Sequence, residues 1–403
     1  MSAEVTEKVA AVEKKVEEKA ADWHLPEALK GLKVGALAYV DYSVGDKPIF
    51  GRRHTGYNRF TLGRGYLNIK KEITPWLRFR YTPDLHQDSK GDWKLRQKYL
   101  YAELRPPNWG RFLTEMKLEI GLGHIAWLDF EEHVNPYRCQ GTMPLERAGV
   151  FNSADLGVSL RGNFGGRLAN AKKVVGSDHY DGRYGSWHIG VYNGSGYHAK
   201  EANDNKVVQY RITLRPLPDH LPGFQVSYFG LYGKGNQDFS PDWIVHEGFL
   251  SYQHPWFILI LQMFATKGNQ SGNWTIPPGI LGHPGKSLWT RGYSVFGDVK
   301  IPVRLFHEYR CHAFFRMDWF NADQDQIIAK DAKYTKLITG MAFKIYKKNL
   351  LLLAYERTWY GGDYGISGGT GYNGTGSRVV APATNNSNLG TDQRFQTVFQ
   401  INF

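Results

Sequence analysis

From Lys33 onward the chain alternates apolar and polar residues with a period of two, and the polar positions include full charges. In residues 208–215, Val, Tyr, Ile and Leu alternate with Gln, Arg, Thr and Arg. Residues 308–319 repeat the pattern with Arg and Asp in the middle of the segment. A strand of this kind has one apolar and one charged face. A soluble sandwich would expose such charges or lack them, so the pattern favours an all-β transmembrane antiparallel barrel, with lipid outside and water inside.

Sixteen segments of this kind can be counted, and even numbers are typical of such barrels. From residue 194 on, short connections alternate with long ones that are often rich in Gly and Asn. A bilayer requires the sheet to close, because an open edge would leave backbone groups unpaired in hydrocarbon. The predicted strands lie near 33–43, 58–70, 75–83, 92–105, 114–124, 151–164, 184–193, 205–216, 222–234, 241–253, 256–267, 290–301, 306–320, 334–347, 349–360 and 392–403.

Aromatic residues and hydropathy agree with a barrel and exclude a helical membrane protein. The mean hydropathy is −0.45, and the longest clean apolar run, Trp256–Leu261, is far shorter than a membrane helix. Aromatic side chains stand at strand ends, where they predict two interfacial girdles. These residues are Trp76, Trp93, Tyr184, Trp187, Trp243, Trp256, Trp289, Trp319, Trp359 and Tyr360.

Residues 1–32 differ from the rest of the chain. Residues 1–22 predict a helix in which Val5, Val9, Val12 and Val16 form an apolar seam. The seam fits either a small oligomerising coiled coil or an exposed amphipathic tail. Residues 23–32 form a connector. The segment 1–32 carries five Lys and seven acidic residues, so the whole-chain charge of +12 becomes +14 on residues 33–403.

The last strand and several short motifs resemble a known family. The chain ends in a strand whose last residue is Phe403, similar to the assembly signal of bacterial outer-membrane barrels. Further likeness lies in Arg64–Lys70, Leu118–Gly123 and Val191–Tyr197, followed by Asn205, Lys206 and Arg211. Together these resemble the sixteen-stranded porin superfamily that includes the phosphate-selective porins O and P. The resemblance covers roughly residues 33–403, and its motifs are loose.

The resemblance implies a trimer in the outer membrane of a Gram-negative bacterium, surrounded by lipid and inserted by the barrel-assembly machinery. Both termini, with the N-terminal helix, would lie in the periplasm, and the third outer loop would fold into the pore. With that orientation the loop is the long connection at about 125–150. Residues 165–183 depart from the pattern as a periplasmic turn of unusual length, so they predict an insertion or an additional short element.

The polar parity of the strands and the inward loop predict the residues along the solute path. Basic positions outnumber acidic ones on the strands, which favours a mild anion preference of a porin that passes ions and small hydrophilic solutes. A general pore with a transverse field between opposite charges is the alternative. The predicted pore-lining set is Arg78, Arg80, Glu115, Glu119, Arg161, Arg211, Arg310 and Arg316 from strands, with Asp129, Glu131, Glu132 and Arg138 from the loop.

Other functions find little support in the sequence. No spacing fits a zinc site, no catalytic motif stands in its structural context, and no cofactor is expected. The basic residues alternate with lipid-type residues, which argues against nucleic-acid binding. Cys139 and Cys311 are expected to be free thiols. One rival function remains, a scaffold barrel that sheathes a partner such as an electron-carrying cytochrome, but a long inward loop argues against it.

Overall fold

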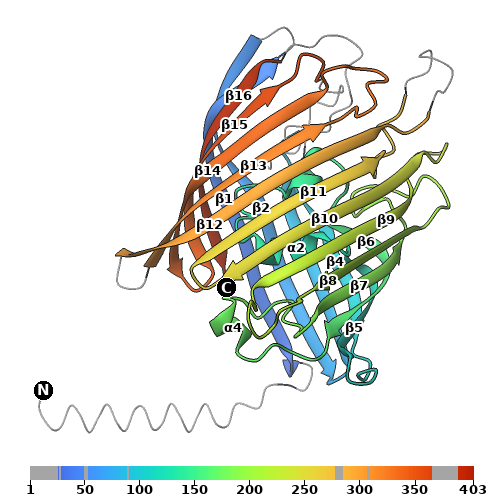
Figure 1. The fold of residues 1–403 in the computed structure, drawn as a ribbon, viewed down its shortest axis with the longest axis vertical. Helices are drawn as coiled ribbons and strands as arrows, with labels where there is room; N and C mark the ends of the chain where they lie inside the picture. The colour runs from blue at the N-terminus through green and yellow to red at the C-terminus, as the bar shows by residue number, and fades with distance from the viewer. Residues whose placement is uncertain are drawn as a thin grey trace, which may run out of the picture.

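Sixteen antiparallel strands close into one barrel, in which β16 pairs with β1 (Figure 1). The computed structural model describes residues 26, 29–49, 53–88, 90–276, 285–305, 309–364 and 389–403. The predicted helix and coiled coil of residues 1–22 lie outside these described residues. The strands are β1 Leu32–Ile49, β2 Arg53–Thr74, β3 Leu77–Gln87, β4 Trp93–Leu104, β5 Leu113–His124, β6 Ala154–Phe164, β7 Gly185–Tyr192, β8 Val207–Leu214, β9 Phe224–Lys234, β10 Asp242–His254, β11 Phe257–Lys267, β12 Trp289–Leu305, β13 Tyr309–Asn321, β14 Lys333–Tyr346, β15 Asn349–Tyr360 and β16 Thr391–Asn402.

The predicted number of strands and their alternation are confirmed. In β8, the residues from Val207 to Leu214 alternate strictly between buried and exposed. The exposed ones are Val208, Tyr210, Ile212 and Leu214, so the outer face is apolar. No helix among the described residues is long and apolar enough to cross a membrane.

The aromatic side chains at the strand ends divide between the two faces. Trp76, Trp93, Tyr184 and Trp256 are exposed on the outside of the barrel, as the girdle prediction requires. The girdle prediction is wrong for Trp243, because its side chain is fully buried inside the barrel. It lies on the same parity of β10 as Val245 and Glu247, which are also buried.

The first and last strands, β1 and β16, meet where the barrel closes. The backbone N–H of Ala36 in β1 donates to the carbonyl of Phe403 at 3.1 Å, and the N–H of Phe403 donates to the carbonyl of Ala36 at 3.2 Å. The side chain of Phe403 is 79% exposed. The terminal residue therefore completes the last strand pairing while its ring stays on the surface.

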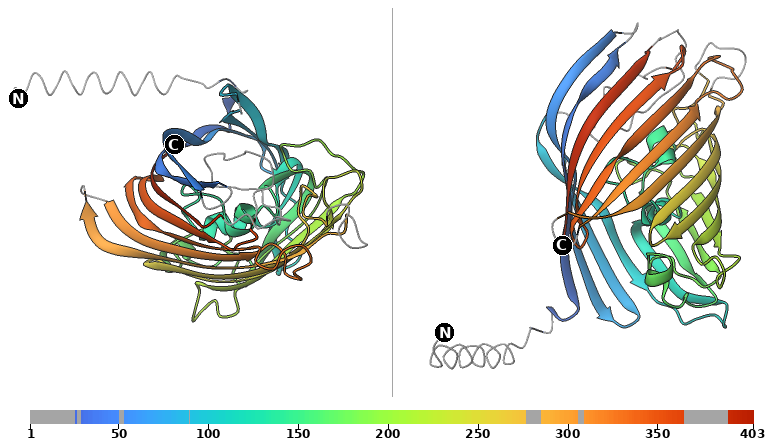
Figure 2. Two further views of the ribbon diagram at one scale, coloured as in Figure 1. Left: turned by 90° about the horizontal axis from the view of Figure 1, so that it is seen from above. Right: turned by 60° about the vertical axis from the view of Figure 1, so that its left-hand side comes forward.

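Residues 125–153, called loop 3 here, connect β5 to β6 and fold into the barrel (Figure 2). The loop contains two short helices, α2 Leu128–Val134 and α3 Pro144–Ala148. Gly149 ends α3 with a φ of 89°, the left-handed conformation that favours glycine. The apolar side chains of the loop, including Trp127, Phe130 and Leu145, are almost completely buried.

The inner face of the barrel is only partly polar, which differs from the expected strict division of the two faces. Inward positions on β9 to β16 carry apolar side chains that form one cluster with loop 3, among them Phe249, Phe264, Phe314, Leu352 and Val398. Loop 3 covers these positions, so burial of apolar area favours them there. The loop therefore lies against the β8–β16 side of the barrel, and open space remains on the β1–β6 side.

Residues 165–184, called the long turn here, connect β6 to β7 and include the short helix α4 Ala171–Val174. This helix is the additional short element that the unusual length of the segment predicted. The end of the turn returns into the barrel, where the ring of Tyr180 meets that of Phe130 at 5.2 Å and its hydroxyl donates to Asp129. Both contacts are with loop 3, so the long turn and loop 3 together divide the interior of the barrel.

Candidate functional site

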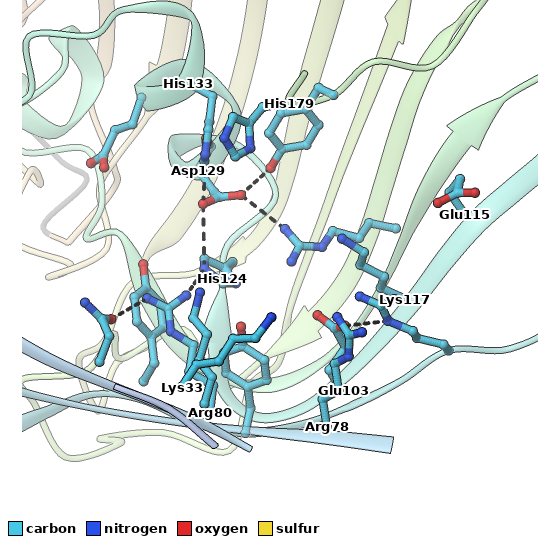
Figure 3. A pocket seen from close by; sticks show the side chains of 18 of the residues that line it. Lys33, Arg78, Arg80, Glu103, Glu115, Lys117, His124, Asp129, His133 and His179 are labelled. Atoms are coloured by element: carbon cyan, nitrogen blue, oxygen red, sulfur yellow. Dashed lines mark hydrogen bonds and ion pairs between the residues drawn. The ribbon is translucent and has the colours of Figure 1, made fainter. Parts of the chain in front are cut away.

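A cavity of about 660 Å³ lies between the barrel wall and the two inward segments (Figure 3). The wall side is built by residues of β1 to β6, and the opposite side by Asp129, Glu132 and His133 of loop 3 with His179 and Tyr180 of the long turn. Alternation along each strand explains the wall. Every second residue of β2 from Arg64 to Glu72 points into the cavity, and the same parity holds for Arg78 and Arg80 on β3.

The guanidinium of Arg80 is held in place on the wall by four groups, none of which is a carboxylate. It stacks on Tyr99 at 4.2 Å from the ring centre and donates to Asn68 Oδ1 at 3.1 Å and to Thr82 Oγ1 at 3.1 Å. Its Nη1 also lies 3.1 Å from His124 Nε2. Four partners, none of them a carboxylate, thus orient a cation whose charge faces the cavity.

Asp129 is the main negative group on the opposite side. It accepts a hydrogen bond from Arg161 Nη1 at 3.1 Å, and its other oxygen lies 3.6 Å from His124 Nε2. Burial alone would raise the pKa of Asp129, but the nearby charges of His124, His133 and Arg161 hold it well below its usual range. The carboxylate therefore stays ionised at any physiological pH.

A second group of charges lies at the edge of the cavity, next to loop 3. Arg138 Nε donates to Glu132 at 2.8 Å and its Nη2 donates to Glu146 at 3.0 Å. Glu132 also lies 3.8 Å from Arg64, which stacks on Tyr66 at 4.7 Å. Positive charge on the wall and negative charge on loop 3 thus face each other across the cavity.

Eight of the twelve predicted pore-lining residues line the cavity or lie directly behind its lining. Six of them line the cavity: Arg78, Arg80, Glu115, Asp129, Glu132 and Arg161. Glu119 lies just behind the lining and binds Arg161 at 2.5 Å and His124 at 2.9 Å. Arg138 likewise lies behind it, between Glu132 and Glu146. The side chain of Arg310 in β13 lies outside the described residues.

Three predicted residues lie away from the cavity and hold loop 3 to the barrel instead. Arg211 is fully buried between the rings of Phe130 and Tyr180 and donates to the carbonyl of Ala126 at 3.2 Å. Arg316 donates to the carbonyl of Thr142 at 2.8 Å while it binds Asp318. Glu131 accepts from Trp127 Nε1 at 2.7 Å. The alternation along the strands correctly predicted that these two arginines point inward. It does not reveal that loop 3 covers them.

A further ionic cluster attaches loop 3 on the same side. Glu356 of β15 accepts from Arg147 of loop 3 at 2.9 Å and from Arg394 of β16 at 2.8 Å, and Lys336 of β14 lies 2.5 Å from its other oxygen. All four side chains are buried. Loop 3 is therefore fastened to the wall by both apolar packing and buried charge.

Some cavity residues were absent from the predicted set. Lys33 and Lys70 lie on the inward parity of β1 and β2, and Tyr99 and Tyr101 on that of β4. Parity could have found these four, but the lysines are close to the strand ends. His179 and Tyr180 come from the long turn, for which unusual length was the only signal.

The histidines of the cavity do not form a metal site. The rings of His133 and His179 lie 4.1 Å apart, centre to centre, where loop 3 meets the long turn. Within the described part of the chain, no group of three His, Cys, Asp or Glu residues is arranged to hold a metal ion. Cys139 on loop 3 and Cys311 on β13 are both free and buried.

The fold is similar to those of solved outer-membrane porins. No family model and no curated protein matches this chain. The anion-selective porin from Comamonas acidovorans superimposes with a TM-score of 0.55 at 12% identity, covering 92% of this chain and 100% of that one. The trimer form of OmpT from Vibrio cholerae gives 0.52 at 10% identity, covering 92% and 100%. Salmonella typhi OmpF, in complex with daunomycin, gives 0.52 at 12% identity, covering 92% and 97%.

Identities this low show the shared fold alone, a sixteen-stranded porin-like β-barrel. The finer resemblance to the phosphate-selective porins O and P does not follow from these similarities and stays a prediction.

Proposed function

We propose that this protein is an outer-membrane porin that lets ions and small hydrophilic solutes diffuse through its barrel, with a preference for anions. The observation that carries the proposal is the charge of the cavity, whose lining includes eleven Lys and Arg side chains and seven Asp and Glu side chains. Charged groups at a narrow point of a channel select permeating ions by sign.

The pairing of these charges strengthens the preference for anions. Most of the acids are neutralised by arginine, as in Glu72 with Arg78 at 3.0 Å, Glu103 with Arg105 at 3.0 Å and Glu115 with Arg167 at 2.8 Å. By contrast, Lys33, Lys70, Arg80 and Lys117 line the cavity, and among the described residues none of them has a carboxylate within 4.0 Å. The positive charge that remains unneutralised therefore exceeds the negative.

The shape of the interior also argues for a solute path and against a scaffold for a cytochrome. Loop 3 and the long turn fill much of the barrel, and the cavity of about 660 Å³ is far too small for a folded protein domain. The outer face is apolar along the strands, as contact with lipid requires.

Assembly as a homotrimer in the bacterial outer membrane completes the proposal. The OmpT structure from Vibrio cholerae, which shares the fold, is described in a trimer form. We also propose that Phe403 acts in the assembly signal, supported by its exposed ring at the barrel closure. An N-terminal coiled coil in the periplasm, formed by residues 1–22, would fit the same trimer.

Reversal potentials in planar bilayers test the proposal. Under a KCl gradient, the purified full-length chain should give stepwise currents whose reversal potential lies toward that of chloride. A reversal potential near zero would show that the channel does not prefer anions. It would favour a general pore in which opposite charges set a transverse field. Correctly folded protein that gives no current would overturn the channel function itself.

A further inference from the structure

We infer that Lys33, Lys70 and Arg80 form a binding site for organic di- or tricarboxylates on the cavity wall. This inference rests on the proposed channel function and specifies which solutes the same cavity favours. It is carried by an arrangement of three cations in one row across three adjacent strands.

The strand register defines the row. Lys33 of β1 is directly opposite Lys70 of β2, and Lys70 is directly opposite Arg80 of β3. The next residue in the row is Tyr101 of β4, opposite Arg80. All four residues line the cavity, so the three charges lie on the same face of the sheet. Figure 3 shows Lys33 and Arg80 close together on the wall, away from Asp129 on loop 3.

The row has no anion of its own. Among the described residues, Lys33 and Lys70 form no side-chain hydrogen bond and no ion pair, and the partners of Arg80 include no carboxylate. Two acids on β2 and β4 that line the same cavity are already paired. Glu72 binds Arg78 at 3.0 Å, and Glu103 binds Arg105 at 3.0 Å.

Such a row is unfavourable unless an anion occupies it. Side chains directly opposite each other in an antiparallel pair have Cβ atoms about 4.5–5.5 Å apart, and like charges in these positions destabilise the sheet. A bound anion would relieve two such repulsions at once. Arg80 is already oriented by Tyr99 and Asn68, so little side-chain entropy is lost when its guanidinium binds a carboxylate.

The length of the row favours a ligand with separated negative charges. Neighbouring strands lie about 4.8 Å apart, so the row spans roughly 10 Å from β1 to β3. A compact oxyanion such as phosphate can bridge two of these cations. A tricarboxylate such as citrate carries its charges several ångströms apart and can contact all three.

The test uses the full-length protein with citrate and inorganic phosphate as probes at neutral pH. Citrate should block the chloride current in a saturable way and bind the detergent-solubilised barrel in isothermal titration calorimetry. Lys70→Gln and Arg80→Gln should each weaken both effects roughly tenfold or more, the loss expected when one charge-assisted contact is removed. Phosphate should bind more weakly than citrate.

Lys117→Gln is the matched control. It removes the same unit of charge from the same cavity, and Lys117 lies on β5, outside the row, where among the described residues it has no paired carboxylate that its loss would release. If Lys117→Gln weakens citrate binding as much as Lys70→Gln does, diffuse charge explains the binding and the site is overturned. Phosphate that binds as tightly as citrate would also overturn the carboxylate assignment. Because calorimetry does not depend on conduction, a barrel that binds citrate without passing current would contradict the proposed function alone.

Discussion

At the scale of single residues, Glu131 shows how loop 3 is held against the wall. Its carboxyl is buried and accepts a hydrogen bond from Trp127 Nε1 at 2.7 Å. It also bonds to Gln262 of β11, whose amide donates to Glu247 of β10 at 2.5 Å. Burial raises the pKa of Glu131 to about 8, although the positive charge of Arg316 opposes the shift. In the docked loop this side chain is therefore mostly protonated at neutral pH.

Replacement of Glu131 with Gln should remove the pH dependence that this carboxyl gives to the docking of loop 3 between pH 4.5 and about 8. In the wild type, docking is strongest below the ordinary pKa of 4.5, where the carboxyl is protonated in both states. Between 4.5 and about 8 the released loop loses this proton and the docked loop keeps it, so docking weakens by up to roughly 5 kcal/mol. Hydrogen exchange of residues 127–134 should be faster at pH 8 in the wild type than in Glu131→Gln.

Comparison of the two proteins at the same pH removes the intrinsic effect of pH on exchange. At pH 5 both should exchange at nearly the same rate. Faster exchange in Glu131→Gln at pH 8 would show that the ionised carboxylate, and not the protonated acid, stabilises the docked loop.

At the scale of structural elements, loop 3 and the long turn both fold into the barrel and contact each other there. Asp129 and His133 of loop 3 contact Tyr180 and His179 of the long turn. The ring of His179 is exposed to the cavity, and the groups that face it are His133, Asp178, Lys348 and Asp129. The cost of burial and the neighbouring His133 lower the pKa of His179 to about 4.

The His133→Gln variant should raise the pKa of His179 toward its ordinary value of 6.5, because it removes one of the causes of the shift and leaves burial and the positive charge of Lys348. Docking of the long turn is fully stable above pH 6.5, where the ring is neutral in both states. It weakens as the pH falls from 6.5 toward 4, because only the released turn then binds the proton. Solvent around the exposed ring will screen part of this effect.

Histidine-selective ¹⁵N NMR of the solubilised barrel measures this pKa, and His179→Gln assigns the resonance. A wild-type midpoint near 6.5 would contradict the contact between the two segments. Unchanged titration of His179 in His133→Gln would show that His133 does not contribute to the shift, and would leave burial and Lys348 as its causes.

The elements themselves were largely predictable, whereas their inward packing was not. Period-two alternation marked all sixteen strands, since lipid and water impose opposite polarity on the two faces of one strand. Arg211 and Arg80 have the same parity and similar surroundings in the sequence, yet one is buried under loop 3 and the other lines the cavity. That difference depends on which wall the loop covers. The row of Lys33, Lys70 and Arg80 depends on strand register, which the pattern of a single strand does not contain.

At the scale of the whole molecule, the barrel has an apolar exterior and a mixed interior. Apolar side chains of loop 3 and of β9 to β16 form a cluster inside the barrel. This cluster is an apolar core that holds the barrel together in addition to the strand pairing. The outside offers apolar side chains such as Leu259, Leu261 and Met263 on successive outward positions of β11, each at least half exposed. In water such a surface would aggregate, so the exterior makes sense only when hydrocarbon or another copy covers it.

A charge placed in the middle of this exterior should therefore cost far more than the same charge near its edge. Leu261 lies near the middle of β11 and is 53% exposed, whereas Tyr232 lies near the end of β9 and is 67% exposed. In a bilayer, Leu261→Arg should lower the free energy of unfolding by about 2–4 kcal/mol and Tyr232→Arg by about 0–1 kcal/mol. Urea unfolding in lipid vesicles, followed by tryptophan fluorescence, gives both values. Equal losses for the two variants would mean that no hydrocarbon layer surrounds the barrel, because the cost of an outward charge depends on its depth only where a bilayer is present.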